Sequence, residues 1–430
     1  MQPKIYHATD HDIDPILIDA DALDIIKKLK EAGFVAYLVG GGVRDLLLKK
    51  KPKDFDISTS ARPEQIKQIF QRSCLLIGRR FRLAHLRIGH KIFEVSTFRS
   101  GENEGDLIIL DNSWGNPEED ALRRDFTMNG LFYDPFNHTV IDFVGGWDDI
   151  HHHLLRTIGS PTIRFREDPV RMIRLLKFQA RFDFKIDAET AKSLSKCHQE
   201  IVKSSPARIL EEILRMLESG SSMPFFKLLS ESNLLELLFP CLDLFMKGKF
   251  GQDVYSHLSA ADEINLQSGK NLLDRAVLAS CLLFPILERE VHVKYLQNHI
   301  IPTFGQILML TASLIQGIVT SSFSHFPKRL SSAMNFILST QYRLTPLSGK
   351  RHPRPKLLHN KEFELALRFL KIRALANEEL MDAYNWWLHL YKQVEKQEER
   401  RGHHPHPPPK HPKEQQNSFP HVESQNAHRP

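Results

Sequence analysis

Cysteine is scarce in this sequence of 430 residues, and the four cysteines that occur form no CxxC pair. A disulfide framework or a cysteine-based zinc site is therefore not expected, and a reducing compartment fits best. The N-terminus also lacks the apolar core of a signal peptide, because Asp10, Asp12 and Asp14 interrupt it. We therefore expect a cytoplasmic protein.

Long uncharged apolar runs are nearly absent as well. The exception is the stretch 295–327, which carries no formal charge, and within it Ile300–Phe323 has the length of a membrane span. Polar residues such as Gln306 and Gln316 interrupt this stretch and share one helical face, opposite a face of apolar residues. We expect a buried helix of a bundle and no contact with a membrane.

The charges are close to balanced, with 58 basic and 52 acidic side chains, a net charge of +6 and a pI near 9.0. This mild excess favours polyanionic partners such as nucleic acids, phosphates or acidic membranes, without choosing among them. With 41% hydrophobic and 26% charged residues, the composition excludes collagen-like, mucin-like and wholly disordered proteins. At ~150 residues per domain, the length suggests about three domains.

The chain divides into an α+β part and an all-α part. Helix and strand patterns alternate up to about residue 147: a helical stripe ends at Gly33, Phe34–Val39 and Phe55–Thr59 are predicted strands, and Leu131–Phe143 is a predicted hairpin. Helical periodicity then prevails until a His/Pro-rich tail. We predict an N-terminal extension, an α+β head, a set of connecting helices, a helical body, a C-terminal helical region and a disordered tail, at 1–20, 21–147, 148–205, 206–343, 344–398 and 399–430.

The strongest chemical signal is a glycine turn followed by two aspartates. Gly40–Gly42 directly follow a predicted strand, and glycines there let backbone N–H groups approach a phosphate closely. Asp54 and Asp56 stand two residues apart on the next predicted strand, so both carboxylates face the same side and can bridge two Mg²⁺ ions. Two such ions suit an in-line phosphoryl displacement. The alternative is a plain glycine turn followed by two solvated aspartates.

The segment GGGVRDLLLKKKPKDFD resembles the head-domain signature of the class II tRNA nucleotidyltransferase and bacterial poly(A) polymerase family, within the polymerase β-like superfamily. The resemblance continues, in order, through Glu119–Asn129 (EDALRRDFTMN), Asp142–Gly146 (DFVGG) and Arg166–Arg174 (REDPVRMIR). It covers residues 25–240 well and the remaining helices loosely. It implies a polymerase β-like head, nucleotide- and RNA-binding neck helices at 148–205, and a nucleotidyltransferase that uses ATP and Mg²⁺, or Mn²⁺ in its place.

The resemblance also implies roles for single residues. Asp54 and Asp56 would hold the metals, while Glu94 and Asp125 compete for the role of a third carboxylate. Asp125, together with an arginine, would recognise the ribose. Glu94 has the alternative of being an exposed strand residue, and Arg123 and Arg124 that of a basic surface. The nucleotide would be bound by Gly41, Gly42, Arg44, Arg123, Arg124, Asp125, Asp168 and Arg171.

The resemblance further implies that Asp168 and Arg171 read the base of the incoming nucleotide. Residues three apart share a helix face, so the pair could present complementary hydrogen-bond groups. Asp168 before a proline is also typical of a helix N-cap, which is the structural alternative. Arg174, Lys177 and Arg181 continue the same basic helix. They are expected to bind RNA or triphosphate, unless they form a solvated face.

Two activities share all of this chemistry, poly(A) addition and tRNA CCA addition. Leu76–His85 (LIGRRFRLAH) and Leu367–Leu388 resemble the poly(A) polymerase subgroup, which favours AMP transfer from ATP to the 3′ ends of mRNA and other transcripts. CCA addition with CTP and ATP is the second hypothesis. An RNA-binding protein with an inactive head is the third, although intact Asp54, Asp56 and Asp125 argue against it.

Overall fold

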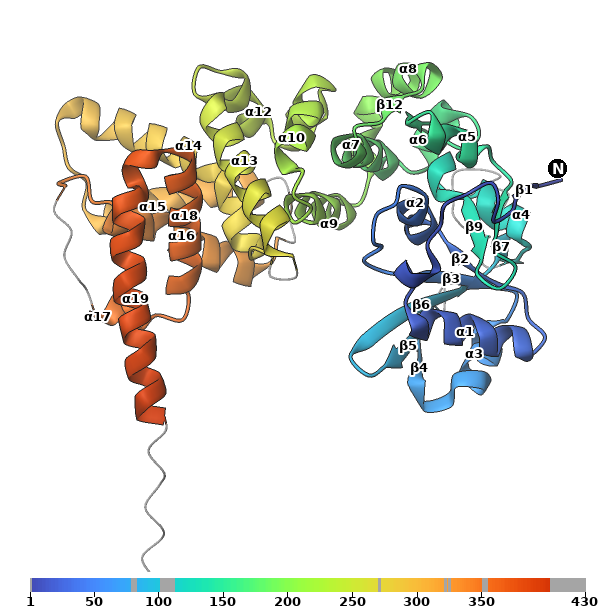
Figure 1. The fold of residues 1–430 in the computed structure, drawn as a ribbon. Helices are drawn as coiled ribbons and strands as arrows, with labels where there is room; N and C mark the ends of the chain where they lie inside the picture. The colour runs from blue at the N-terminus through green and yellow to red at the C-terminus, as the bar shows by residue number, and fades with distance from the viewer. Residues whose placement is uncertain are drawn as a thin grey trace, which may run out of the picture.

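The computed structural model describes residues 2–78, 83–100, 113–269, 272–320, 323, 326–349 and 355–402. A mixed β-sheet with flanking helices forms the N-terminal head, and helices account for nearly all of the rest. Figure 1 shows the head at one end of an elongated molecule, with the helices extending away from it. The predicted α+β class, a mixed-sheet head followed by helices, is confirmed.

The head is organised on one eight-stranded sheet with the order β1-β10-β9-β2-β3-β6-β5-β4. Among its neighbouring strands only β3 and β6 run parallel, with Ile57 opposite Val95. The strands are β1 (Lys4–Tyr6), β2 (Ala36–Val39), β3 (Asp56–Thr59), β4 (Cys74–Ile77), β5 (Leu83–Ile88), β6 (Lys91–Thr97), β9 (Leu131–Asp134) and β10 (Thr139–Asp142).

Local patterns predicted the central strands of this sheet, whereas β1, β4 and β5 were missed, and β1 and β4 are its two edges. The hairpin of β9 and β10 pairs Thr139 with Asp134 across the predicted turn. In contrast, β1 lies within the predicted N-terminal extension and pairs with β10 along one edge. Its three residues are too short for a recognisable alternation, so only the neighbouring strand reveals it.

Helices cover the sheet, and the apolar stripe of α1 lies where the sequence predicts it. α1 (Ala20–Glu31) is capped by the Asp19 carboxylate, which accepts a hydrogen bond from the Asp21 N–H. Its stripe Ala22, Ile25, Ile26 and Leu29 is fully buried against the sheet, and α1 contacts β2 and β3. The other helices of the head are α2 (Gly41–Leu47), α3 (Pro63–Phe70), α4 (Pro117–Leu122) and α5 (Gly146–His151).

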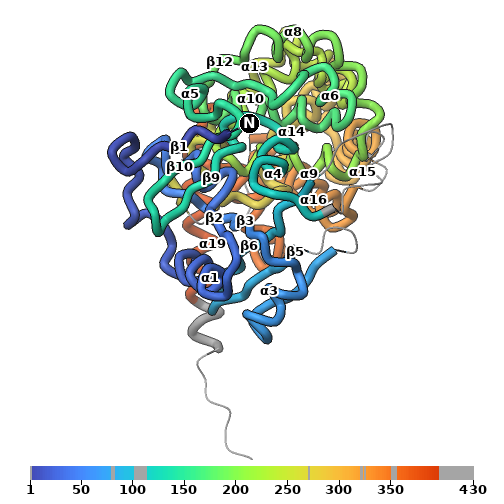
Figure 2. Tube along the Cα trace, turned by 90° about the vertical axis from the view of Figure 1, so that its right-hand side faces the viewer, coloured from blue at the N-terminus to red at the C-terminus, as the bar shows by residue number. Residues whose placement is uncertain are grey.

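The helical part starts beside the head and continues away from it (Figure 1). In Figure 2, seen from the head end, most of these helices lie behind the head. α7 packs on α9 and α10, and so connects the head side of the molecule to the later helices. These helices are α6 (Pro161–Glu167), α7 (Val170–Phe182), α8 (Ala188–Cys197), α9 (Pro206–Leu217), α10 (Ser222–Glu231), α11 (Leu234–Leu238), α12 (Pro240–Lys247), α13 (Gly251–Ser268), α14 (Arg275–Lys294), α15 (Phe304–Ile315), α16 (Lys328–Leu344), α17 (Pro355–Leu358), α18 (Phe363–Ala376) and α19 (Met381–Gly402).

The uncharged stretch forms α15, which is less buried than predicted. Ile307 and Ile315 face the interior, but Leu308 is 40% and Met309 75% exposed. The prediction of a buried bundle helix therefore holds for one face of α15, and the other face is exposed. Within the described part of the chain, no helix combines the length and apolarity that crossing a membrane requires.

The C-terminal helices form their own small core. Trp387 is fully buried, and its indole N–H donates to the carbonyl of Leu344 at 2.9 Å, while Trp386 packs edge-on against it. Trp387 therefore serves a helix–helix contact. α19 continues to Gly402, beyond the predicted start of the tail at 399, and the rest of the tail lies outside the described residues.

Candidate active site

The glycine turn joins β2 to α2 at the base of a cavity. Gly40 has φ +67° and ψ −130°, a conformation that side chains rarely adopt, and a Cβ there would lie 3.1 Å from Arg124 Nη1. α2 begins at Gly41, so Gly41 and Gly42 form its first turn, not a loop. The segment thus directs the start of a short helix towards the cavity.

Asp54, Asp56 and Glu94 converge on one side of the sheet. Asp56 opens β3, and Asp54 lies just before the strand. Glu94 lies on β6, whose parallel pairing with β3 brings it next to Asp56. The side chain of Asp56 is accessible to solvent, yet its pKa is raised to about 6. Desolvation is the main cause, followed by the charges of Glu94 and Asp54, and Arg124 acts in the opposite direction.

Two cavities meet at these carboxylates. The narrow cavity has a volume of ≈ 430 Å³ and extends between the glycine turn and α7. The wide cleft, ≈ 1030 Å³, lies between the head and helices α9, α13 and α14, and its lining includes Lys53, Asp54, His85 and Glu94. Asp56 and Arg181 line both spaces. A group in one cavity can therefore meet a group in the other at Asp56.

Asp125 lies in the narrow cavity and is engaged by the protein itself. Its carboxylate accepts hydrogen bonds from Asn129 Nδ2 at 3.0 Å and from Arg174 Nε at 2.8 Å. Burial raises the pKa of Asp125, but the charge of Arg174 and these hydrogen bonds outweigh burial, so the pKa lies below its usual value. The Asp125 carboxylate thus anchors α7 through Arg174.

Arg44 is almost completely buried behind the cavity and is held by two hydrogen-bond partners. It donates to Asp45 Oδ1 at 2.7 Å and to Asn129 Oδ1 at 2.8 Å, and its guanidinium stacks on the ring of Phe182. Burial lowers the pKa of Arg44, and the neighbouring Asp45 opposes this effect. Only part of its surface reaches the cavity.

The basic face of α7 lines the cavity, which excludes the alternative of a solvated face. Arg174 pairs with Asp125 at 2.7 Å and with Glu212 on α9 at 3.7 Å, and Lys177 also pairs with Glu212. Arg181 pairs with Asp45 at 3.6 Å. Each of these cations already has a carboxylate partner, so their positions are fixed before any ligand binds.

Asp168 and Arg171 both line the narrow cavity, but the predicted capping role of Asp168 is wrong. Asp168 ends α6 and Pro169 occupies the N-cap of α7. The Asp168 carboxylate instead accepts two hydrogen bonds from Arg208 on α9, at 3.0 and 2.8 Å. Arg171 Nη1 donates to the carbonyl of Arg164 at 3.0 Å. A two-bond ion pair outweighs a single capping hydrogen bond.

The two neighbouring arginines differ in position. Arg124 lines the narrow cavity and pairs with Asp120 at 2.9 Å, whereas Arg123 ends α4 and is not part of the lining. Sequence analysis assigned no role to Arg208, Glu212 or Asn129. Asn129 is the last residue of the quoted motif Glu119–Asn129, so its place in that motif could have indicated a role. Arg208 and Glu212 lie on α9, for which no motif was found.

The carboxylates suit a divalent cation that arrives with a nucleotide. Within the described residues, no three metal-ligating side chains form a ready-made cage. Mg²⁺ commonly uses one or two carboxylates and completes its shell with water and substrate phosphates. Desolvation and then the charge of Glu94 raise the pKa of Asp56, and a bound cation would favour the charged carboxylate against both effects. The donor set therefore fits Mg²⁺.

Three family models match successive parts of the chain. A poly A polymerase head domain matches residues 36–156, a probable RNA and SrmB-binding site of polymerase A matches 183–246, and a polymerase A arginine-rich C-terminus matches 318–419. Their order follows the order of the head, the middle helices and the C-terminal region.

Poly(A) polymerase I of Salmonella typhi is 36% identical over 395 residues, which are 86% of this chain and 82% of that protein. A CCA-adding enzyme of Lactobacillus helveticus is 35% identical over 217 residues, 50% of this chain and 54% of that enzyme. The fold resembles a tRNA nucleotidyltransferase crystallised with a primer tRNA and an ATP analogue (TM-score 0.57, 23% identity, 86% of this chain and 99% of that one). The chain belongs to the bacterial poly(A) polymerase I family of class II nucleotidyltransferases, and CCA-adding enzymes are its more distant, partial relatives.

Proposed function

We propose that this polymerase transfers AMP from ATP to RNA 3′ ends without a template and releases pyrophosphate, in the cytoplasm. The observation that supports this most directly is the position of Asp56 between two cavities. The narrow one has the size and basic wall for one nucleoside triphosphate, and the wide one can admit the end of a chain. The RNA 3′-hydroxyl and the α-phosphorus of ATP would meet beside Asp56.

We assign Asp54 and Asp56 to two Mg²⁺ ions, for which Mn²⁺ can substitute. Glu94 is the better candidate for the third carboxylate, because it adds negative charge next to Asp56 while Asp125 is occupied by Arg174 and Asn129. When bound, the metals activate the attacking hydroxyl and neutralise the triphosphate. The protein's own contribution is positioning.

The narrow cavity would hold ATP. Gly41 and Arg124 line its metal end, where the phosphates would lie, and Asp168 and Arg171 line it at α7, where the base would be read. Gly42 lies in the first turn of α2, outside the lining. Arg174 and Lys177, predicted to bind RNA, line only this cavity, so we assign them to the nucleotide. Arg123 lies outside the lining and receives no role.

Asp168 can read a base only if its carboxylate is fixed. Its two hydrogen bonds from Arg208 fix it, and they use one oxygen each, which leaves the remaining lone pairs for the exocyclic amino group of adenine. Arg171 supplies donors from the same helix face. We therefore propose that Arg208 positions the base-reading residue and does not itself touch ATP.

The RNA end would enter through the wide cleft. Lys50, Lys53 and Arg215 line it, Arg181 lies at its junction with the narrow cavity, and such cations track a phosphate backbone. The cleft has walls from both the head and the helical part, so RNA contacts would come from both sides.

The test uses the full chain with Mg²⁺, an unstructured RNA oligonucleotide and a tRNA without its CCA end, each supplied with labelled ATP or CTP. Asp54→Ala/Asp56→Ala is the blank. We expect long ATP-dependent ladders on the oligonucleotide that the blank abolishes. Three-nucleotide addition confined to the tRNA and dependent on CTP would overturn the proposal in favour of CCA addition. RNA binding without incorporation would favour an inactive head.

A further inference from the structure

Asn129 lies between the two sides of the narrow cavity, the glycine turn with α2 on one side and α7 on the other. Its Oδ1 accepts a hydrogen bond from Arg44 Nη1 at 2.8 Å, and its Nδ2 donates to Asp125 Oδ1 at 3.0 Å. Asn129 is 7% exposed and lines the cavity. One amide group therefore joins an arginine of α2 to the carboxylate that anchors α7.

These contacts belong to a closed chain that begins and ends on α7. Asp45 accepts from Arg44 through Oδ1, and its Oδ2 lies 3.6 Å from Arg181 Nη2. At the other end, Arg174 donates to Asp125, and Arg174 and Arg181 lie seven residues apart on α7, which is about two helical turns. In order, the chain consists of Arg174, Asp125, Asn129, Arg44, Asp45 and Arg181. It fastens α7 to the head at two points, and Asn129 lies in its middle.

The two neighbours of Asn129 require an amide at this position. Arg44 can only donate hydrogen bonds, and the charged carboxylate of Asp125 can only accept them. The residue between them must therefore offer one acceptor and one donor. An aspartate would place a second carboxylate against Asp125, and a leucine would bond to neither neighbour.

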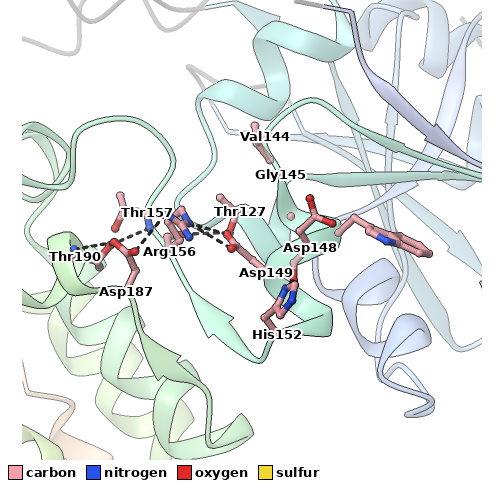
Figure 3. Close-up of polar contacts among 12 residues, drawn as sticks. Thr127, Val144, Gly145, Asp148, Asp149, His152, Arg156, Thr157, Asp187 and Thr190 are labelled. Carbon is pink, nitrogen blue, oxygen red and sulfur yellow. Dashed lines mark hydrogen bonds and ion pairs between the residues drawn. The ribbon is translucent and has the colours of Figure 1, made fainter.

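The turn that carries Asn129 is itself held from behind. Asn129 ends the short 3-10 turn Thr127–Asn129, and the Thr127 hydroxyl donates to Asp149 at 2.7 Å. Arg156 joins Asp149, 3.1 Å from its Nε, to Asp187, 3.2 Å from its Nη1 (Figure 3). Asp187 in turn caps α8. The turn is thus fixed by contacts within the protein.

We propose that Asn129 is a positioning residue that holds α7 at a fixed distance from the glycine turn. The inference rests on the proposed function, in which ATP spans the narrow cavity with its phosphates at the head and its base at α7. A ligand that spans two sites gains affinity when their separation is fixed, because its second end then binds at a high effective concentration. Loss of Asn129 should therefore affect whole ATP much more than either half of it.

The binding test compares a non-hydrolysable ATP analogue with adenosine and with inorganic tripolyphosphate, using the full chain and Mg²⁺ without RNA. Asn129→Leu keeps the size of the side chain and removes both hydrogen bonds. Titration calorimetry should show that the Kd of the ATP analogue rises about tenfold, while that of each half changes less than about twofold. Gln341→Leu removes another fully buried amide, which bonds to the Ala366 carbonyl and to Arg373 on α18, and should leave all three constants unchanged.

Hydrogen exchange of the ligand-free protein provides a second measurement that does not depend on ATP. The amides of α7 should exchange about tenfold faster in Asn129→Leu, because one link of the chain is cut. The amides of α8, which Asp187 caps, should exchange at the wild-type rate. Asn129→Ala, which removes the same hydrogen bonds without filling the space, should show the same pattern in both measurements.

Unchanged binding of the ATP analogue in both Asn129 variants would overturn the proposal. So would a half that weakens as much as the whole, because Asn129 would then touch that half directly. If the wild-type protein binds neither the analogue nor its halves, the proposed function fails. The exchange of α7 then decides on the link alone, and wild-type rates in both variants would show that Asn129 does not fasten α7.

Discussion

The two walls of the narrow cavity, one from the head and one from α7, differ in how far their charges are balanced. On the head wall, burial and then the neighbouring charges of Glu94 and Asp54 raise the pKa of Asp56 to about 6, so the charged form of this carboxyl group is disfavoured. On the α7 wall, Arg174 is matched by Asp125 and Glu212, and its pKa rises because these partners favour its charged form. One wall is incomplete without a cation, and the other is complete before anything binds.

The difference between the walls suits the two tasks that the proposed function requires, metal-assisted displacement and reading of the base. An unbalanced carboxylate wall gains most from mobile cations, which is what a metal-assisted displacement needs. A balanced, hydrogen-bonded wall gains little from charge, but it holds donors and acceptors in fixed places, which is what reading a base needs. Single substitutions in either wall test this difference most directly.

The largest effect is expected on the head wall. Asp56→Asn keeps the size of the side chain but removes the charge shared by both cavities, and AMP incorporation should fall about a thousandfold or more. Asp24→Asn, a largely exposed aspartate on α1, is the control and should retain full activity. Single-turnover incorporation with saturating ATP measures the loss. Near-normal rates in Asp56→Asn would remove the head wall from catalysis.

On the α7 wall, Arg208→Ala should act on selectivity. Without its two hydrogen bonds the Asp168 carboxylate is free to turn, and kcat/KM for ATP relative to CTP should fall about tenfold or more, since hydrogen bonds to charged groups are worth ~1.5–3 kcal/mol. Arg208→Lys should recover only part of the preference, because lysine lacks the planar fork. Arg368→Ala breaks a comparable exposed ion pair with Glu364 and serves as the control.

An unchanged ATP preference in Arg208→Ala, together with a reduced preference in Asp168→Ala, would show that Asp168 does not need its partner. Steady-state kinetics with each nucleotide in separate reactions supply both ratios. The same experiment tests whether the two walls are independent, since Arg208→Ala should leave the Mg²⁺ requirement unchanged.

The parts of this site that sequence could predict are those set by local spacing. Asp54 and Asp56, two residues apart, do reach the same cleft, and the buried stripe of α1 follows from its period. Glu94 could be only one of two candidates, because its proximity to Asp56 depends on the parallel pairing of β3 with β6. The partner of Asp168 lies 40 residues away on another helix, and no local pattern encodes that contact.

The segment Leu76–His85 shows that a motif can identify a family without revealing what its side chains contact. Its resemblance favoured poly(A) addition, and the family assignment confirms that choice, but residues 79–82 lie outside the described structure. His85 is described and lies in the wide cleft, 3.6 Å from Glu94. A motif thus identified the family without revealing how its side chains act.

A change of pH should also affect the stability of the protein through Asp56 on the head wall. Because the folded state raises the pKa of Asp56 from 3.8 to about 6, the native protein binds more protons than the unfolded chain in that interval, and this group's contribution to stability is lost as pH rises through it. Asp56→Asn should therefore raise the melting temperature of the metal-free protein at pH 7.5, measured by calorimetry.

Metal binding should follow the same titration with the opposite sign. Below pH 6 the apparent Mg²⁺ affinity should fall by up to about tenfold per pH unit, because a proton occupies the ligand, and above pH 7 it should level off. Manganese binding in the presence of a non-hydrolysable ATP analogue, followed by electron paramagnetic resonance, measures this directly. A flat profile between pH 5 and 7 would mean that Asp56 is not the limiting ligand.

The smallest effect on function is expected in the wide cleft, from the removal of one basic side chain that lies outside the narrow cavity. Lys53 lines it beside Asp54 without reaching the nucleotide cavity, so its removal should weaken RNA binding only a few-fold. If Lys53 neutralises one phosphate, Lys53→Ala should lower the slope of log affinity against log salt by about one, whatever the RNA sequence. Lys27→Ala, an exposed lysine on α1, should change neither quantity. Fluorescence anisotropy at several salt concentrations separates these outcomes, and an unchanged slope in Lys53→Ala would place the RNA backbone on the opposite side of the cleft, towards Arg215.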